Sequence, residues 1–280
     1  MRGTTASSPG RSTEGGTGRL GSRVGALPVV GGVRSHVEVS HLSVEYAASR
    51  LSGATLAVSD VSFSVAPGER LVIIGPSGCG KSTLLKAAGG LLEPSSGSVR
   101  IGEADDDRIG FVFQSDALLP WRTALANVEL AARLAGADEP RARSVELMGS
   151  LGLGDAEGKY PSQLSGGMRK RVALARALAY DPSVFFMDEP FGALDAQTRI
   201  SVGNFLLGLL EQFGQTVVFV THDLDEAIAL ADRILVMTAS PGGVADVVEV
   251  PLPKPRDYYE SRFEEGFTDL QKRVWELISP

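Results

Sequence analysis

The chain has 280 residues, of which 43% are hydrophobic and 22% are charged, as is typical of one or two globular domains. A formal net charge of -7 argues against a general nucleic-acid binder, because such proteins present a basic surface. The single cysteine excludes an internal disulfide, and no uninterrupted apolar run approaches the ~20 residues of a membrane-spanning helix.

Residues 1–35 are rich in Gly, Ser, Thr and Arg, and they contain five arginines against the single acidic residue Glu14. This segment has too little apolar surface to offset the entropy of ordering, so we expect a disordered N-terminal extension. A weak membrane-binding tail is the alternative, since clustered basic residues attract anionic lipid. The folded domain is expected to span residues 36–280.

The first ordered elements are strands. Apolar and polar residues alternate from Val37 onward, but the alternation slips by one position at Ser40-His41. This slip predicts two strand segments separated by a bulge or bend. Another strand is expected over about 58–65, where Pro67-Gly68 ends it.

Further along the chain, short apolar runs without polar alternation are typical of strands buried on both faces. The runs cover 71–74, 184–187, 217–220 and 234–237, and helical stretches are predicted at about 81–91, 166–180, 196–213 and 224–231. This alternation predicts an α/β protein with a largely parallel sheet. The mostly helical, polar segment between Gln114 and Gln163 predicts an inserted helical subdomain at about 115–170.

A glycine-rich segment follows the first buried run and opens a helix. It reads Gly75, Pro76, Ser77, Gly78, Cys79, Gly80, Lys81, Ser82 and Thr83. This is the spacing and the context of a phosphate-binding P-loop, whose glycines let backbone N–H groups turn toward phosphate oxygens. We predict that Lys81 binds the β- and γ-phosphates, that Ser82 ligates Mg²⁺ and that Thr83 reaches the α-phosphate. A Gly-rich turn without a ligand is the alternative, and the position after a strand weakens it.

Four more polar residues each follow a predicted strand, namely Gln114, Asp188, Glu189 and His222. Ligands of open α/β sheets bind at the carboxyl ends of the strands, where these side chains would meet. Asp188 is the expected carboxylate partner of Mg²⁺, and Glu189 the expected general base that polarises the attacking water. Gln114 would contact both metal and water, and His222 would donate to the γ-phosphate. Any one of them alone would also fit an ordinary surface residue.

A second glycine-rich helix start, Leu164-Ser165-Gly166-Gly167-Met168, precedes a basic helix and is also suited to an anion. One nucleotide does not need two such cradles from one chain. We therefore expect two copies to meet head to tail, each completing the other's site. Tyr46, at the end of the first strand, could stack on adenine for ~1–3 kcal/mol, by analogy with nucleobase stacking. A strand-end tyrosine without a ligand is the alternative.

Together these motifs resemble the ATP-binding cassette (ABC) ATPases over about residues 37–250. The matching segments are a Walker A loop (75–83), a Q-loop glutamine (Gln114), an LSGGM signature (164–168), a Walker B strand (184–188) with Glu189, a D-loop (Ala193-Leu194-Asp195) and a switch histidine (His222). Tyr46 falls where that family places its adenine-stacking aromatic residue. The resemblance implies a P-loop NTPase fold with a mainly parallel core sheet, an N-terminal antiparallel β subdomain and an inserted α-helical subdomain.

The resemblance also implies the cofactors ATP and Mg²⁺ and a homodimer with two ATPs at its interface. The catalytic residues would be Lys81, Gln114, Glu189 and His222, and the metal would be held by Ser82, Gln114 and Asp188. Ser165, Gly166, Gly167 and Asp195 would contact the nucleotide, the first three through the γ-phosphate of the ATP on the opposite subunit.

A finer resemblance, to importers of the nitrate, sulfonate and taurine group, rests on residues 188–195, on Leu118-Leu119-Pro120-Trp121 and on Ser240-Pro241-Gly242-Gly243 followed by residues 251–256. The last of these opens a C-terminal tail expected at about 251–280. The finer resemblance implies a peripheral ATPase at the cytoplasmic face of the membrane, bound to transmembrane permease subunits and supplied by an external substrate-binding protein. One departure is Lys170, where a glutamine is commoner; the family pattern places it facing away from the nucleotide.

The apolar segment 117–121 beside Gln114 would be an awkward free surface, and we expect it to be a socket for a short helix of the permease. In the alternative, Trp121 packs into the helical subdomain. An iron–sulfur assembly ATPase and the ATPase of an export complex are alternative functions. The Leu-Leu-Pro-Trp segment and Phe191-Gly192-Ala193 count against the iron–sulfur assembly ATPase. Export ATPases more often have Thr-Gly-Asn in place of Phe191-Gly192-Ala193.

Overall fold

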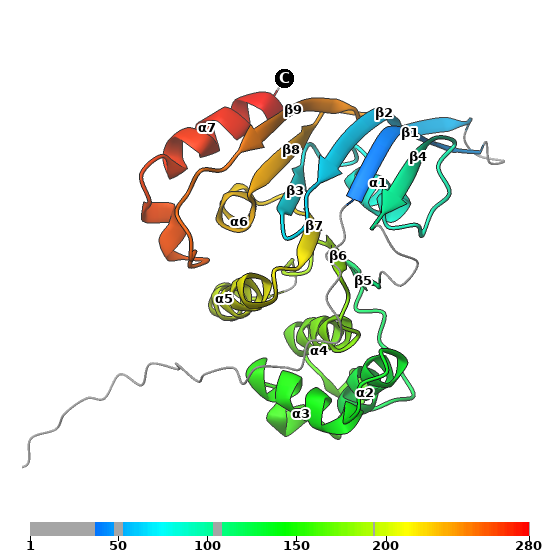
Figure 1. Cartoon of the computed structure of the whole chain (residues 1–280), viewed down its shortest axis with the longest axis vertical. Helices are drawn as coiled ribbons and strands as arrows, with labels where there is room; N and C mark the ends of the chain where they lie inside the picture. Colours follow the sequence, from blue (N-terminus) through cyan, green and yellow to red (C-terminus); the bar gives the residue numbers. More distant parts are fainter. Residues whose placement is uncertain (1–36, 48–52, 103–107, 193, 280) are drawn as a thin grey trace, which may run out of the picture.

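The computed structural model describes residues 37–47, 53–102, 108–192 and 194–279 (Figure 1). The predicted N-terminal extension and Ala193 of the D-loop lie outside the described residues. Within them, two β sheets and their covering helices form one lobe, and α2 and α3 lie at the opposite end of the molecule from α7 (Figure 1).

The smaller sheet is antiparallel and has the strand order β2-β1-β4. Its strands are β1 (Val37–Tyr46), β2 (Thr55–Val65) and β4 (Ser96–Ile101). The pairing register of β1 shifts between Val39 and Leu42, where His41 has a φ of 51°. The predicted bulge is therefore confirmed, although the strand runs through it and counts as one element.

The larger sheet has six strands in the order β5-β6-β7-β3-β8-β9. They are β5 (Ile109–Val112), β6 (Val184–Asp188), β7 (Thr216–Val220), β3 (Arg70–Ile74), β8 (Arg233–Met237) and β9 (Val244–Glu249). Every neighbouring pair is parallel except β8 and β9. The four predicted apolar runs are four of these strands, and three of them are buried along their whole length. Because β7 lies between β6 and β3, the loops that follow these three strands are neighbours.

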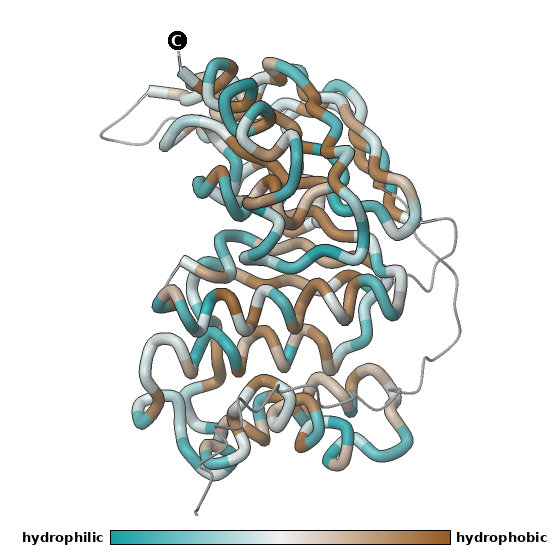
Figure 2. The backbone as a smooth tube through the Cα atoms, turned by 90° about the vertical axis from the view of Figure 1, so that its left-hand side faces the viewer, coloured by the Kyte–Doolittle hydropathy of each residue, from teal (hydrophilic) through white to brown (hydrophobic). Residues whose placement is uncertain are grey.

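Alternate residues of each central strand enter two different hydrophobic clusters. On β3, Leu71 and Ile73 pack with the antiparallel sheet and helix α1 (Lys81–Ala88), whereas Val72 and Ile74 pack in the cluster that includes most of the other helices. Burial on both faces is why these runs lack polar alternation. In Figure 2 the hydrophobic segments accordingly run through the interior of the molecule.

The remaining helices lie close to their predicted ranges. They are α4 (Gly166–Ala179), α5 (Ala196–Phe213), α6 (Leu224–Leu230) and α7 (Phe267–Ile278). α1 ends three residues earlier than predicted, because Gly89 and Gly90 follow it and Gly90 adopts a φ of 72°. Gly214, with a φ of 59°, ends α5 in the same left-handed conformation.

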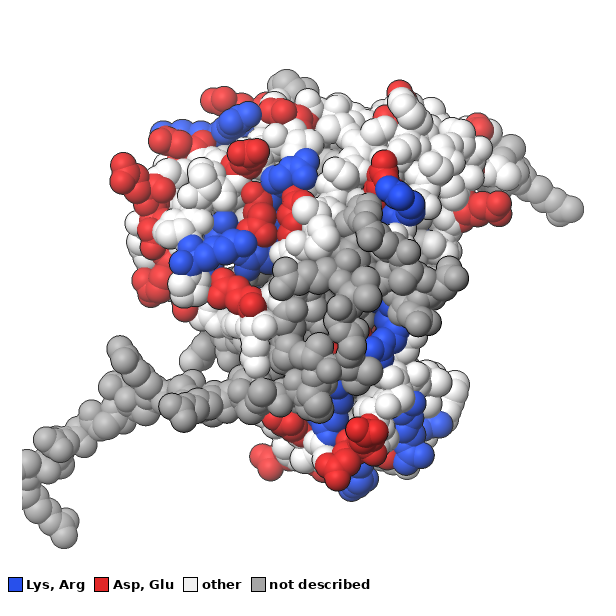
Figure 3. Space-filling view, in the orientation of Figure 1, with Lys and Arg blue, Asp and Glu red and all other residues white. Residues whose placement is uncertain are grey.

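Between Gln114 and α4 the described residues form helices α2 (Ala124–Leu134) and α3 (Pro140–Ser150) and two short 3₁₀ turns, with no strand. The apolar faces of α2 and α3 pack on α4, which joins them to the core. The predicted fold class, with its helical insertion, is thus confirmed. Across the described segments, no helix combines the length and the apolar character that crossing a membrane requires. In Figure 3 acidic and basic side chains lie side by side on the left part of the upper lobe and at the lower end of the molecule.

Candidate functional site

The loop after β3 has the backbone shape of an anion cradle. Gly78 and Gly80 adopt φ values of 76° and 98°, which side chains other than glycine rarely tolerate. Gly80 also caps α1 without any side-chain hydrogen bond, so the first N–H groups of the helix have no capping acceptor. A helix start of this kind, preceded by turning backbone amides, is suited to phosphate.

Lys81 is folded into this loop. Its Nζ donates to the carbonyl oxygens of Gly75, at 2.8 Å, and Pro76, at 2.9 Å, and the residue is only 8% exposed. Cys79 of the same loop is buried beside it. The two carbonyls therefore hold a full positive charge at the loop, where a phosphate chain would need it.

Ser82 and Asp188 link the P-loop to the end of β6. The Ser82 hydroxyl donates to Asp188 Oδ1 at 2.8 Å. Burial raises the pKa of Asp188, and the hydrogen bond from Ser82 opposes that rise. A hydroxyl and a carboxylate are the hard oxygen donors that Mg²⁺ prefers. No group of three or more His, Cys, Asp or Glu suited to a metal occurs in the part of the chain that the structure describes, so an ion here would take further ligands from a nucleotide.

Glu189 joins the two other predicted polar residues. Its Oε2 accepts a hydrogen bond from Gln114 Nε2 at 3.2 Å, and its Oε1 contacts His222 Nδ1 at 3.0 Å. Since a carboxylate only accepts, the imidazole donates from Nδ1. Glu189 has a φ of 44°, an uncommon conformation for a residue with a side chain and one that clusters at functional sites. Side chains that follow β5 and β7 thus both bind the carboxylate of Glu189, which follows β6.

Tyr46 lies at the edge of the same region. Its hydroxyl is 3.1 Å from Thr83 Oγ1 at the start of α1, and 46% of the residue is exposed. The contact places the ring beside the P-loop and leaves part of it accessible, as stacking on a base requires.

The second set of predicted nucleotide contacts is separate from this cluster. Ser165 caps α4 by accepting from Met168 N at 3.2 Å, and it is exposed. Asp195 caps α5 by accepting from Thr198 N at 3.0 Å, and that hydrogen bond lowers its pKa. Among the described residues no hydrogen bond connects residues 165–167 or Asp195 to the P-loop, and α4 lies apart from α1 in Figure 1.

Lys170, the departure from the family pattern, contacts the backbone beside Gln114. Its buried Nζ donates to the backbone carbonyls of Phe113, at 3.0 Å, and Gln114, and it is 3.7 Å from Asp116. Burial lowers the pKa of Lys170, while Asp116 opposes the change. Arg176 of the same helix donates to the carbonyl of Ala117. Helix α4 therefore holds the backbone of the Q-loop.

A further buried group was not anticipated from the sequence. Glu226 on α6 contacts Thr221, and it accepts a hydrogen bond from Tyr258 of the C-terminal segment at 3.1 Å. Burial raises its pKa to about 7. Glu226 lies beside Asp225 in the short helix Leu224–Leu230 and gives no signal of its own, because its partner Tyr258 comes from a distant position in the chain.

This shift predicts a pH-dependent stability. The folded pKa of Glu226 lies above that of an ordinary glutamate, so its stabilising contribution is complete at low pH and is lost as pH rises toward 7. One pKa unit corresponds to about 1.36 kcal/mol. Between pH 5 and pH 8 the free energy of unfolding of wild type should therefore fall by about 2 to 3 kcal/mol relative to that of Glu226→Gln. Urea unfolding of both proteins at the two pH values measures this. An unchanged difference between them would contradict the assignment.

A parallel sheet with a P-loop after one strand, and acidic and amide side chains at the neighbouring strand ends, defines a P-loop nucleoside triphosphatase. A protein-family model described as "ABC transporter" matches residues 58–192. The chain is 42% identical over 234 residues to the aliphatic sulfonates import ATP-binding protein SsuB of Bacillus cereus, covering 81% of this chain and 90% of SsuB. It is 44% identical over 215 residues to the nitrate import ATP-binding protein NrtD of Synechococcus elongatus, covering 73% and 78%.

Among solved structures, the dimeric ATP-binding cassette MJ0796, in a post-hydrolysis state bound to ADP and Pi, superposes with a TM-score of 0.68 at 35% identity. The alignment covers 76% of this chain and 98% of MJ0796. The chain therefore belongs to the ABC transporter family and is one of its ATP-hydrolysing domains.

Proposed function

We propose that this chain is the ATPase subunit of an importer for a small anion or organic acid of the nitrate, sulfonate and taurine type. The observation that carries the ATPase part of the proposal is the convergence of Gln114, Glu189 and His222 beside a P-loop. The likeness to SsuB and NrtD, both described as import proteins, supports the transport direction and the class of cargo.

In this proposal the P-loop binds the phosphates of ATP through residues 75–83, with the ammonium of Lys81 as the main charge. Tyr46 stacks on the adenine. The oxygen donors of Ser82, Gln114 and Asp188 fit Mg²⁺, which would neutralise charge on the phosphates when bound.

Glu189 is the proposed general base for hydrolysis. Its carboxylate is aimed by two donors from neighbouring strand ends, which reduces the number of rotamers it can adopt. A water beside it would lose a proton to the carboxylate as it attacks the γ-phosphorus, while the bond from that phosphorus to the bridging oxygen breaks and ADP leaves with the oxygen. Gln114 and His222 hold the base, and His222 can transfer its hydrogen bond to the terminal phosphate.

The second glycine-rich helix start, residues 165–167, supports a dimer of two copies of this chain. Within one chain, residues 165–167 and Asp195 have no contact with the P-loop among the described hydrogen bonds, although each lies at the start of a helix. We infer that they act on the ATP of a second copy, bound head to tail. The dimeric cassette MJ0796 supports this inference by its likeness.

A docking surface for a permease is the other part of the proposal. Trp121 is 71% exposed, so the alternative in which it packs into the helical subdomain is wrong. The fully buried side chain of Asn127 holds the loop that carries Trp121. Its Oδ1 accepts a hydrogen bond from Leu119 N, and its Nδ2 donates to the carbonyl of Leu119 and to two further backbone carbonyls. A large apolar side chain on a fixed loop is suited to a partner protein.

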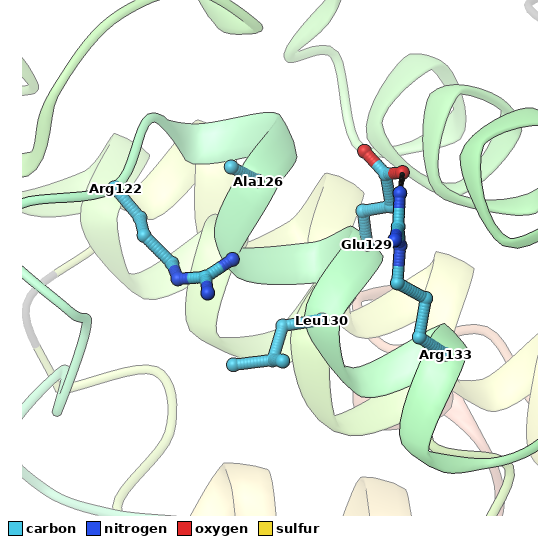
Figure 4. A pocket seen from close by; sticks show the side chains of 5 residues that line it. All are labelled: Arg122, Ala126, Glu129, Leu130 and Arg133. Atoms are coloured by element: carbon cyan, nitrogen blue, oxygen red, sulfur yellow. Dashed lines mark hydrogen bonds and ion pairs between the residues drawn. The ribbon is translucent and has the colours of Figure 1, made fainter.

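A pocket of about 270 Å³ adjoins this loop on α2. In Figure 4 the side chains of Arg122 and Leu130 point into the same space, while Glu129 and Arg133 pair with each other at its side. A pocket that is lined by both apolar and charged side chains fits a short amphipathic helix of a transmembrane subunit. The ATPase would thereby lie at the cytoplasmic face of the membrane, with an external binding protein delivering cargo.

Affinity capture with the full chain from detergent-solubilised membranes tests the proposal. Wild type should retain a permease and, through it, a binding protein whose ligand is a small anion or organic acid. Trp121→Ala should weaken capture about 30-fold, because a buried tryptophan at an interface is worth about 2 kcal/mol or more. Trp275→Ala is the matched control, since Trp275 is 59% exposed on α7, and it should capture normally. Capture of an export complex or an iron–sulfur assembly complex would overturn the proposal.

A further inference from the structure

The backbone around His222 is held in a turn by its neighbour Thr221. The Thr221 hydroxyl accepts a hydrogen bond from Asp223 N at 3.0 Å, which encloses His222 between two bonded residues. Thr221 is almost completely buried, whereas His222 is largely exposed. The direction of the imidazole toward Glu189 therefore depends on how firmly the Thr221 side chain is fixed.

Glu226 holds the Thr221 hydroxyl by a direct contact. One carboxyl oxygen of Glu226 contacts the Thr221 hydroxyl, and the other accepts from the Tyr258 hydroxyl at 3.1 Å. The charged groups that face this carboxyl are Asp223 and Arg199, which lie 3.5 Å apart. A buried chain of three side chains thus connects the C-terminal segment to the residue before His222.

Tyr258 also touches the loop that carries Glu189. Its ring meets Phe191 edge-on, with centroids 5.9 Å apart, and Phe191 lies two residues after Glu189. The ring also lies against Gly203 of α5, where an added Cβ would be only 2.4 Å from the ring. The tyrosine is therefore seated between the Glu189 loop, α5 and Glu226.

The main chain on both sides of Tyr258 is also held. Asn204 on α5 accepts from Tyr258 N at 2.5 Å and donates to Asp257 at 2.7 Å. Arg256 is buried and donates to the backbone carbonyls of Ala231 and Val250. These contacts keep the hydroxyl of Tyr258 at Glu226 independently of the helix that follows.

We propose that Tyr258 and Glu226 are positioning residues for hydrolysis, which hold the turn at Thr221 so that His222 points at Glu189. The proposal rests on the function proposed above for His222. It gives the C-terminal segment a part in hydrolysis although that segment contributes no atom to the site.

Steady-state kinetics of the full chain test the proposal. Tyr258→Phe removes one hydroxyl and keeps the ring, and it should lower kcat about tenfold, near the upper range for one hydrogen bond, with KM for ATP changed less than about twofold. Glu226→Ala should lower kcat at least as much. Glu226→Gln should lower kcat much less than Glu226→Ala, because its amide oxygen can still accept one hydrogen bond. Tyr259→Phe, at the neighbouring partly exposed tyrosine, is the matched control and should behave as wild type.

A second readout follows His222 directly. The chain has three histidines, so the imidazole resonances of His222 can be assigned by their loss in His222→Ala. Tyr258→Phe should shift them, and Tyr259→Phe should not. Unshifted resonances together with an unchanged kcat in Tyr258→Phe would overturn the proposal, as would a tenfold rise in KM.

The same series separates this proposal from the function on which it depends. Full hydrolysis by His222→Ala would refute the role of His222, and the resonances of Tyr258→Phe would still decide whether the network orients the imidazole. Inactive His222→Ala combined with normal Tyr258→Phe and Glu226→Ala would refute the positioning network alone.

Discussion

Glu189→Gln is expected to lower ATP hydrolysis about 10³-fold while ATP binding stays intact. The glutamine has the same shape, so it can still meet Gln114 or His222, but its amide cannot take a proton from water. Nucleotide binding depends on the P-loop and should not change. ATP would then bind without being cleaved, and the paired state should accumulate.

Two measurements check this result. Single-turnover phosphate release gives the loss in rate, and light scattering with size-exclusion chromatography gives the mass of the ATP-bound species. Glu276→Gln, at an exposed position on α7, is the matched control and should remain active and should not accumulate as a dimer. A monomeric Glu189→Gln protein with undiminished turnover would contradict both the general base and the shared site.

Lys81→Ala is expected to remove measurable nucleotide binding, a loss of at least about 100-fold in affinity. A helix dipole contributes only ~0.3–2 kcal/mol near its end, too little to hold a triphosphate without the ammonium. Each charge-assisted hydrogen bond from that ammonium adds about 1.5–3 kcal/mol. The lysine is already held at the loop by two carbonyls, so little further ordering is needed on binding.

Calorimetric titration with ATP measures this loss, and a thermal unfolding curve shows whether the variant is folded. Lys272→Ala, an exposed lysine on α7, is the matched control and should bind as wild type. Retained micromolar affinity for ATP in Lys81→Ala would contradict the assignment.

Local patterns predicted those parts of the fold that depend on local chemistry. The buried runs are strands because both of their faces are covered, and the slip in the alternation at Ser40-His41 is a real bulge. The P-loop could be read for the same reason, since its glycines are needed at their own positions. Gln114, Glu189 and His222 could be placed together because strand ends in a parallel sheet share one edge.

Contacts between distant segments were not predictable in this way. Nothing in the tail indicates that Tyr258 reaches Glu226, because that contact depends on the path of residues 251–266 across α5 and α6. The contact of Lys170 with the Q-loop was not predictable for a related reason. The pattern of its own helix does not show that the Q-loop backbone passes over its ammonium.

The grip of Lys170 on the Q-loop has a consequence for the pair. Ser165 caps helix α4, and Lys170, about one turn into the helix, donates to the carbonyl of Gln114. In the head-to-tail arrangement that we propose, the first residues of α4 would contact the ATP of the neighbouring subunit. Lys170 of the same helix would hold Gln114, which acts on the ATP of its own subunit. Loss of the terminal phosphate on either side would then remove a contact from the same helix, so α4 would couple the two ATP sites of the pair.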